Sequence, residues 1–421
     1  MDTASFLMNL FKKYYSNNPA KIKAPSELQK REFGFMFFKH SAVIRHLGFE
    51  EDSQLRMFLM REAPSDVFYS AAYYTHPNMP KMQMKGWEGC DLIFDIDADH
   101  IETSCKSNHD KWRCQVCGMG GKGVKPERCP SCGGSKIEEV KWLCDVCLEA
   151  AKLETIKVVE DFLIPDLGIH EKEISICFSG HRGYHIHVES DSVKELSAQA
   201  RREIIDYIKG VGLDPELHGL QEVGRERLII GPDIKDKGWR GRIAKYVVKF
   251  VSELNENQIK SEERHVKKRL LVVLKEKQNI LNYLTLHPPR WGALRKIDIN
   301  LWRLIVERAV NMAKGEIDEP VTADIRRLIR LPTSLNGKTG FEVKPLSLNE
   351  LDDFDPFRDS QVFKGQKTVY AIEVPPFRIG DETFGPYVDK KVELPLSAAV
   401  FLLCKGVAKI PNTDVAGIQN V

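Results

Sequence analysis

The feature that most restricts the fold of this chain is a cluster of cysteines in its first half. Seven of the ten cysteines in the 421 residues lie between Cys105 and Cys147. Two pairs have the C-x-x-C spacing with a glycine after the second cysteine: Cys114, Cys117, Cys129 and Cys132. In an intracellular chain this spacing is typical of zinc ligands rather than disulfides. We therefore expect a small, metal-held insert over residues 105–147.

The remaining candidate ligands of the insert form a second set. This set comprises Cys105, His109, Cys144 and Cys147. Zinc prefers thiolate and imidazole ligands, and four protein ligands leave no open position for catalysis. We expect two structural Zn²⁺ ions, with the ribbon of C-x-x-C pairs nested inside the outer set. Two alternatives are a single zinc with spare thiols, and His100 in place of His109.

Composition places the chain among globular proteins. It is 42% hydrophobic and 29% charged, with a net charge of +2, so an anion site has to come from local clusters of basic residues. The N-terminus has no evident signal peptide, and the apolar run 394–404 is too short to span a bilayer. We expect a soluble, cytoplasmic protein without a membrane segment.

Strand-like and helix-like segments alternate along the chain, which favours an α/β or α+β fold with mixed sheets. We expect a helix from Cys147 and another from Ser192 to Gly210. The expected catalytic core comprises residues 1–104, 148–245 and 301–421. The zinc-binding insert occupies 105–147, and a charged helical subdomain occupies 246–300.

Two aspartates end an otherwise apolar strand in the segment LIFDIDADH, which runs from Leu92 to His100. Because side chains alternate along a strand, Phe94 and Ile96 face the core while Asp95 and Asp97 share the other face. Paired carboxylates suit hard cations such as Mg²⁺ or Mn²⁺. Asp99 has the same parity but lies where the chain leaves the strand. The alternative is a solvated strand end.

A glycine-rich turn follows in SGHRGYHIHV, from Ser179 to Val188. Gly180 and Gly183 permit a tight turn whose N–H groups can cradle phosphate, and Arg182 adds a planar donor fork. After the turn, His185 shares a face with His187. The alternative is a basic hairpin with two surface histidines.

A third block, residues 315–341, combines acidic and basic side chains. Its charged residues are Asp318, Asp324, Arg326, Arg327, Arg330 and Lys338. The segment NGKTG within it predicts a turn that presents the lysine. A charged amphipathic helix ending at Pro332 is the alternative explanation of the backbone.

In this order, the three blocks resemble the archaeal and eukaryotic DNA primases, in particular the archaeal-type small, catalytic subunit. The matching segments are REFGF, IRHLGF, FYSAAYY, GCDLIFDIDADH, CDVCLEAAKLE, SGHRGYHIHV and DEPVTADIRRLIRLPTSLNGKTGF. They cover most of residues 30–345. The resemblance implies a primase-type α/β core, and it likens the outer zinc set to the zinc knuckle of the family.

The resemblance also implies roles for individual residues. Asp95 and Asp97 match the metal-binding pair, and Asp318 matches the third carboxylate, with Asp324 as second choice. The positions implied to hold the triphosphate are Ser179, His181, Arg182, His185, Arg330 and Lys338. Two positions depart from the family pattern: His181 stands where arginine is often found, and Asn336 where histidine is usual.

The function implied is template-directed synthesis of primers on single-stranded DNA from nucleoside triphosphates. Two Mg²⁺ or Mn²⁺ ions would serve this nucleotidyl transfer, and a large regulatory subunit is the expected partner. One alternative is a repair-type primase-polymerase that extends existing ends. Another is a non-catalytic, zinc-ribbon nucleic-acid-binding protein. Synthesis on an unprimed template distinguishes a primase from both of these alternatives.

Overall fold

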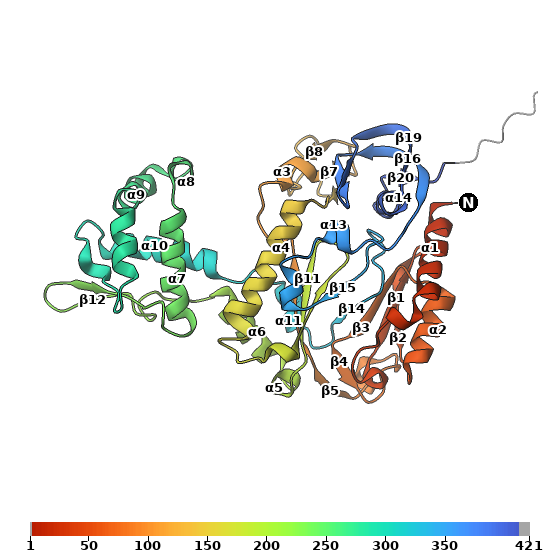
Figure 1. Cartoon of the computed structure of the whole chain (residues 1–421), viewed down its shortest axis with the longest axis horizontal. Helices are drawn as coiled ribbons and strands as arrows, with labels where there is room; N and C mark the ends of the chain where they lie inside the picture. Colours follow the sequence, from red (N-terminus) through yellow and green to blue (C-terminus); the bar gives the residue numbers. More distant parts are fainter. Residues whose placement is uncertain (1, 412–421) are drawn as a thin grey trace, which may run out of the picture. The chain divides into compact units, whose positions relative to one another are not determined.

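The computed structural model describes residues 2–411, and Figure 1 shows their elements. The chain forms two compact units. The first contains residues 1–156, 171–202 and 317–421, and the second contains residues 157–170 and 203–316. None of the described helices is long and apolar enough to cross a membrane.

The first unit contains a four-stranded antiparallel sheet covered by two helices (Figure 1). Its strand order is β14 (Leu328–Arg330), β3 (Asp66–Ser70), β1 (Phe33–Phe37) and β2 (His40–Leu47). The helices are α1 (Thr3–Asn17) and α2 (Asp52–Glu62). Phe11 and Tyr15 of α1 and Leu55 of α2 are fully buried in the same core as Phe33 and Phe35. This core fixes the sheet that carries Arg330.

A second antiparallel sheet of the same unit carries the acidic strand and the glycine-rich turn. Its order is β15 (Lys344–Leu346), β10 (Ile174–Phe178), β11 (Gly183–Val188) and β6 (Leu92–Asp97). On β6, Phe94 and Ile96 are fully buried, and Asp95 and Asp97, which alternate with them, point to the other face. The register pairs His185 with Asp95 and Gly183 with Asp97. The predicted division of faces on the two strands is therefore confirmed.

Smaller elements complete the first unit. The cysteine-rich insert contains α3 (Lys106–His109) and a sheet of β8 (Gly120–Lys122), β7 (Lys111–Cys114) and β9 (Ile137–Val140). A C-terminal sheet contains β19 (Tyr387–Pro395), β16 (Gln366–Val374) and β20 (Ala408–Lys409), and α14 (Leu396–Cys404) packs against it. Two hairpins pair β4 (Ala72–Tyr74) with β5 (Trp87–Cys90), and β17 (Phe377–Ile379) with β18 (Glu382–Phe384). The short helices are α5 (Asp191–Lys194), α11 (Glu319–Ala323), α12 (Leu348–Leu351) and α13 (Pro356–Asp359).

The second unit is mainly helical. Its elements are α7 (Gly238–Glu253), α8 (Glu256–Lys260), α9 (Arg264–Leu284), α10 (Ile299–Ala313) and a hairpin of β12 (Gln221–Val223) and β13 (Leu228–Ile230). The buried rings of Trp291 and Trp302 meet edge to face at 4.7 Å. The range 246–300, predicted as a helical subdomain, lies inside this unit.

The boundary between the units falls within two further helices, and both differ from the predicted ranges. Helix α4 (Asp145–Val158) begins two residues before Cys147. The predicted helix from Ser192 to Gly210 is divided into α5 and α6 (Ala198–Lys209). The break has a local cause, because the Ser197 hydroxyl accepts the N–H of Ala200 and starts a new helix there.

Candidate active site and zinc centres

The carboxylates of Asp95 and Asp97 lie on the polar face of the second sheet, opposite β11. Both side chains are half-buried. The Nε2 atom of His185 is 3.6 Å from Oδ1 of Asp95. The Oδ1 atom of Asp97 accepts the N–H of Asp99 at 2.9 Å, so the chain turns away immediately after the strand. The strand end therefore presents two carboxylates from a rigid element.

Asp318 lies beside this pair although it is more than 200 residues away along the chain. Its N–H donates to the backbone oxygen of Asp95 at 2.9 Å, and its side chain forms no capping bond with α11. Asp324 differs: it is exposed, and its Oδ1 accepts the N–H of Arg326 at 2.9 Å. Of the two candidate acids, Asp318 is the one adjacent to the acidic strand.

Burial and mutual repulsion shape the charge of this site. Burial, reinforced by the charge of Asp318, raises the pKa of Asp95 from 3.8 to about 6. Burial, with Asp99 as the next cause, also raises the pKa of Asp97. Burial and then Arg330 lower the pKa of His185 to about 3, so its imidazole is neutral. A site that disfavours bare carboxylate charge and whose acidic side chains supply oxygen ligands fits hard cations.

We predict that replacing Asp95 by asparagine stabilises the protein in buffer without Mg²⁺ or Mn²⁺. A carboxyl whose pKa is higher in the folded than in the unfolded state loses stabilisation as pH rises from about 4 to about 6. Above pH 6 the ionised Asp95 opposes folding, and asparagine removes that cost of about 1–3 kcal/mol. The melting temperature should therefore rise at pH 7.5 and change less at pH 4.5.

The matched control for this prediction is Asp324→Asn, which removes an exposed carboxylate that caps a turn. It should give no gain in melting temperature. Added Mn²⁺ should stabilise the wild type more than Asp95→Asn. An asparagine variant that is less stable than the wild type at every pH would contradict the electrostatic account.

The SGHRG turn joins β10 to β11, and two glycines are required for its shape. The N–H of Ser179 donates to the oxygen of Gly183 at 2.9 Å, which closes the turn. Gly180 has a φ of +74°, a conformation that costs other residues energy. A Cβ atom on Gly183 would lie 2.0 Å from the oxygen of Ile96, so only glycine lets β11 approach β6 here.

The NGKTG turn is joined to the SGHRG turn by side-chain hydrogen bonds. Fully buried Asn336 donates from Nδ2 to the oxygen of Ser179 at 2.9 Å. Its Oδ1 accepts the N–H of Lys338 at 2.9 Å, and the Thr339 hydroxyl donates to the oxygen of Gly180. Asn336, which departs from the family pattern, thus holds the two turns together, and Lys338 is left exposed above them.

Arg182 is the basic residue of the SGHRG turn, and it is buried, with 1% of its surface exposed. Its Nε atom is 2.9 Å from Oδ1 of Asp99, whose Oδ2 also pairs with Lys141 at 2.7 Å. None of its three side-chain nitrogens has a well-aligned hydrogen-bond partner among the described residues. Because buried polar groups without partners are costly, this guanidinium is suited to an anionic ligand.

Arg330 reaches the site from the first sheet. Its guanidinium pairs with buried Asp66 and lies over the Phe68 ring, 5.0 Å from the centroid. The Oδ1 atom of Asp66 also accepts the N–H of Gly337 at 3.1 Å, which ties the NGKTG turn to β3. Arg330 and His185 both line a cavity of about 240 Å³.

Sequence reasoning missed a buried polar network at the opposite end of β6 and β11. The carboxylate of Asp91 accepts from Tyr73 at 2.6 Å and pairs with Arg31 at 2.7 Å and with His187 Nε2 at 2.8 Å. The Tyr69 hydroxyl is 2.9 Å from Nδ1 of His187. The same network links β3 to β11 and so joins the two sheets. Its sequence signals were an aspartate just before an apolar strand and the placement of His187 on the same face as His185.

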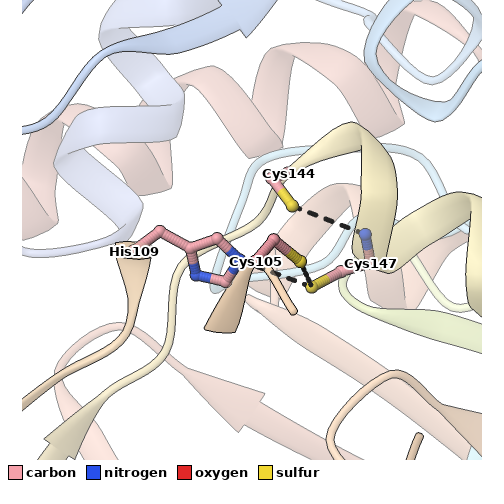
Figure 2. Close-up of side chains that lie close together, drawn as sticks. All are labelled: Cys105, His109, Cys144 and Cys147. Carbon is pink, nitrogen blue, oxygen red and sulfur yellow. Dashed lines mark hydrogen bonds between the residues drawn. The ribbon is translucent and has the colours of Figure 1, made fainter. Parts of the chain in front are cut away.

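The outer zinc set is assembled at the start of α4 (Figure 2). The ligand atoms of Cys105, His109, Cys144 and Cys147 all lie within 4.8 Å of one another. Sγ of Cys147 is 3.3 Å from Sγ of Cys105 and 3.4 Å from Nε2 of His109. Nδ1 of His109 contacts Oδ1 of Asp110 at 2.8 Å, which leaves Nε2 for a metal. His109, not His100, belongs to this group.

The inner set brings the ligand atoms of Cys114, Cys117, Cys129 and Cys132 within 4.8 Å of one another. Sγ of Cys114 is 3.6 Å from Sγ of Cys132, and the Cys117–Cys129 separation is also 3.6 Å. Tetrahedral zinc with bonds of about 2.3 Å places its sulfurs about 3.8 Å apart, so the set fits this ion. The N–H groups of Cys117 and then Val116 lower the pKa of Cys114 to about 6, which favours the thiolate.

These features define the class of protein: a mixed α/β core of the primase type, carrying cysteine groups that can hold zinc. Residues 138–348 match the family model of the DNA primase small subunit. The chain is 37% identical to the DNA primase small subunit PriS of Methanothrix thermoacetophila, over 97% of this chain and 99% of that protein. It is 32% identical to PriS of Nitrosopumilus maritimus, over 96% and 98%. The chain therefore belongs to the DNA primase small-subunit family.

Proposed function

We propose that this chain is the catalytic subunit of a DNA primase, which makes short primers on single-stranded DNA from nucleoside triphosphates. The observation that carries the proposal is that Asp318 bonds to the backbone of Asp95, which shares a strand face with Asp97, beside two cation-bearing turns. Catalysis of phosphoryl transfer depends mainly on positioning and on neutralising charge. Both requirements match the groups gathered at this site.

In this proposal the three carboxylates hold a pair of Mg²⁺ or Mn²⁺ ions. Such a pair activates the attacking hydroxyl and stabilises the leaving oxygen in phosphoryl transfer. The 3′-hydroxyl would attack the α-phosphorus of the incoming nucleotide and lose its proton to solvent, a phosphodiester bond would form, and the bond from the α-phosphorus to pyrophosphate would break. The N–H of Asp318 donates to the backbone oxygen of Asp95, and this bond holds the third carboxylate beside β6.

The triphosphate is proposed to lie against the SGHRG and NGKTG turns. The ligands for it are Ser179, His181, Arg182, His185, Arg330 and Lys338. Arg182 offers a buried guanidinium whose nearest carboxylates are Asp99, at 2.9 Å, and Asp110, at 3.9 Å, and Lys338 adds an exposed ammonium. His185 is neutral, and its Nε2 atom is 3.6 Å from Asp95. A neutral imidazole donates one hydrogen bond, which His185 can give to the triphosphate beside the metal-binding carboxylates.

We predict that Arg182→Ala lowers kcat/KM for the nucleotide about 10- to 100-fold, because one charge-assisted contact is worth about 1.5–3 kcal/mol. Template affinity should change little. Lys141→Ala is the control, because it also removes a cation from Asp99. Steady-state rates at varied nucleotide and varied template separate the two effects. A variant that lost only template binding would move Arg182 to a different role.

The test of the function is incubation with labelled nucleoside triphosphates, Mg²⁺ or Mn²⁺ and unprimed single-stranded DNA. Short, template-complementary products support a primase. Products that form only when a primer is supplied would favour a repair-type primase-polymerase. Template binding with no incorporation on either substrate would favour a non-catalytic zinc-ribbon protein.

The remaining partners follow from the same proposal. We propose that a large regulatory primase subunit assembles with this chain and that the complex works in the cytoplasm. The zinc ions are proposed to be structural, because each has four protein ligands and no open position for a substrate. Co-purification of the two subunits as a heterodimer tests the assembly.

A further inference from the structure

The side chain of Lys405 lies beside the SGHRG turn, and the proposed function does not yet give it a role. Its Nζ atom donates to Nε2 of His181 at 2.9 Å. Burial, together with the charges of Lys405 and Lys338, lowers the pKa of His181, so the imidazole is neutral and can accept this bond. The hydrogen bond to His181 therefore holds the Lys405 side chain against the SGHRG turn.

Lys405 adds a third cation to a site that already contains Arg182 and Lys338. Burial and then the charges of Arg182 and Lys338 lower the pKa of the Lys405 ammonium to about 7. The carboxylate of Asp99 raises the pKa of Lys405, but it is already paired with Arg182 and Lys141. Like charges gathered in a partly buried site are unfavourable unless an anion binds among them.

The position of Lys405 is fixed by the end of α14. Its N–H donates to the oxygen of Phe401, and Gly406 follows with a φ of +72°, the usual way to end a helix. Phe401 stacks on Phe341, at 5.6 Å, just after the NGKTG turn. Gly340 of that turn approaches so closely that a Cβ atom would lie 2.3 Å from Val400. The helix is thus packed directly on the turn.

We propose that Lys405 is a further triphosphate-binding residue, delivered by the C-terminal helix and aimed by His181. This inference rests on the proposed function and extends it. His181, itself a proposed triphosphate ligand, then also positions Lys405 through Nε2, and the ammonium beside it supplies positive charge at this side of the turn. His181 and Lys405, which this proposal brings together at one site, are 224 positions apart in the chain.

The test compares Lys405→Gln, which removes the charge, with Lys405→Arg, which keeps it. Calorimetry of the full-length protein in Mg²⁺ would measure binding of a non-hydrolysable nucleoside triphosphate and of inorganic triphosphate. We expect Lys405→Gln to weaken both about tenfold or more, and Lys405→Arg to bind within a few-fold of the wild type. The KM for nucleotide should rise in Lys405→Gln with little change in the melting temperature.

The matched control is Lys409→Gln, an exposed lysine four residues further on that lies near Tyr370. It should bind triphosphate like the wild type. Affinity in Lys405→Gln equal to that of the control would overturn the inference, as would equal weakening in the glutamine and arginine variants. Failure of the proposed function itself is distinguishable, because the wild type would then bind no triphosphate at the site.

Discussion

Replacing Asp95 or Asp97 by alanine is expected to abolish nucleotide incorporation, with a loss of at least about 10³-fold for either variant. Each variant removes a carboxylate from the pair on β6 and leaves the apolar face of the strand intact. Incorporation of labelled nucleotide in single-turnover conditions measures the effect. Circular dichroism and zinc content should match those of the wild type.

The same experiment separates the two candidates for the third carboxylate. Asp318→Ala should reduce incorporation by a similar factor, because its backbone contact keeps it beside Asp95 and its charge acts on that residue. Asp324→Ala should cost no more than a few-fold, because its carboxylate is exposed and caps a turn. Wild-type rates for Asp97→Ala, or a larger loss for Asp324→Ala than for Asp318→Ala, would contradict the assignment.

The second large effect concerns zinc. Elemental analysis after extensive dialysis is expected to find two zinc ions per chain, since two complete four-ligand sets are present. Cys114→Ser with Cys117→Ser should lose one ion and keep the other. Cys144→Ser with Cys147→Ser should lose the other one and lower the stability by several kcal/mol, because bound structural zinc contributes directly to folding.

The difference in stability follows from where the two sets lie. Cys144 immediately precedes α4, and buried Cys147 lies in its first turn, whereas the ribbon cysteines connect only elements of the insert. Thermal unfolding of the two double variants side by side measures this difference. One zinc per chain in the wild type, removed by either double variant, would show that the two sets are not independent sites.

Local patterns in the sequence predicted the faces of two strands and the grouping of the candidate metal ligands. Alternation along residues 92–97 and 183–188 was enough to assign faces, because strand geometry allows no other arrangement. The positions of cysteines and histidine predicted both groups of candidate metal ligands, since ligand type and spacing restrict the choice. The predicted helix over 192–210 was wrong in its continuity, because capping by Ser197 was overlooked.

Long-range placement could not be predicted from these patterns. Nothing local says that Arg330 lies in a different sheet from Asp95, or that Asp66 on β3 holds it. The sequence does not reveal the role of Lys405 for the same reason, because its contact with His181 depends on the packing of α14 against a turn that is distant in sequence. Asn336 was noticed only as a departure from a family pattern, and its hydrogen bonds supply the reason for its type.

The most direct test of the central claim is anomalous diffraction from crystals grown with Mn²⁺ and a non-hydrolysable nucleoside triphosphate. The account predicts manganese bound by carboxylates of Asp95, Asp97 and Asp318, with the triphosphate lying against the Ser179–Gly183 turn. Manganese found instead at Asp91 and Glu189, with the triphosphate away from both turns, would contradict it.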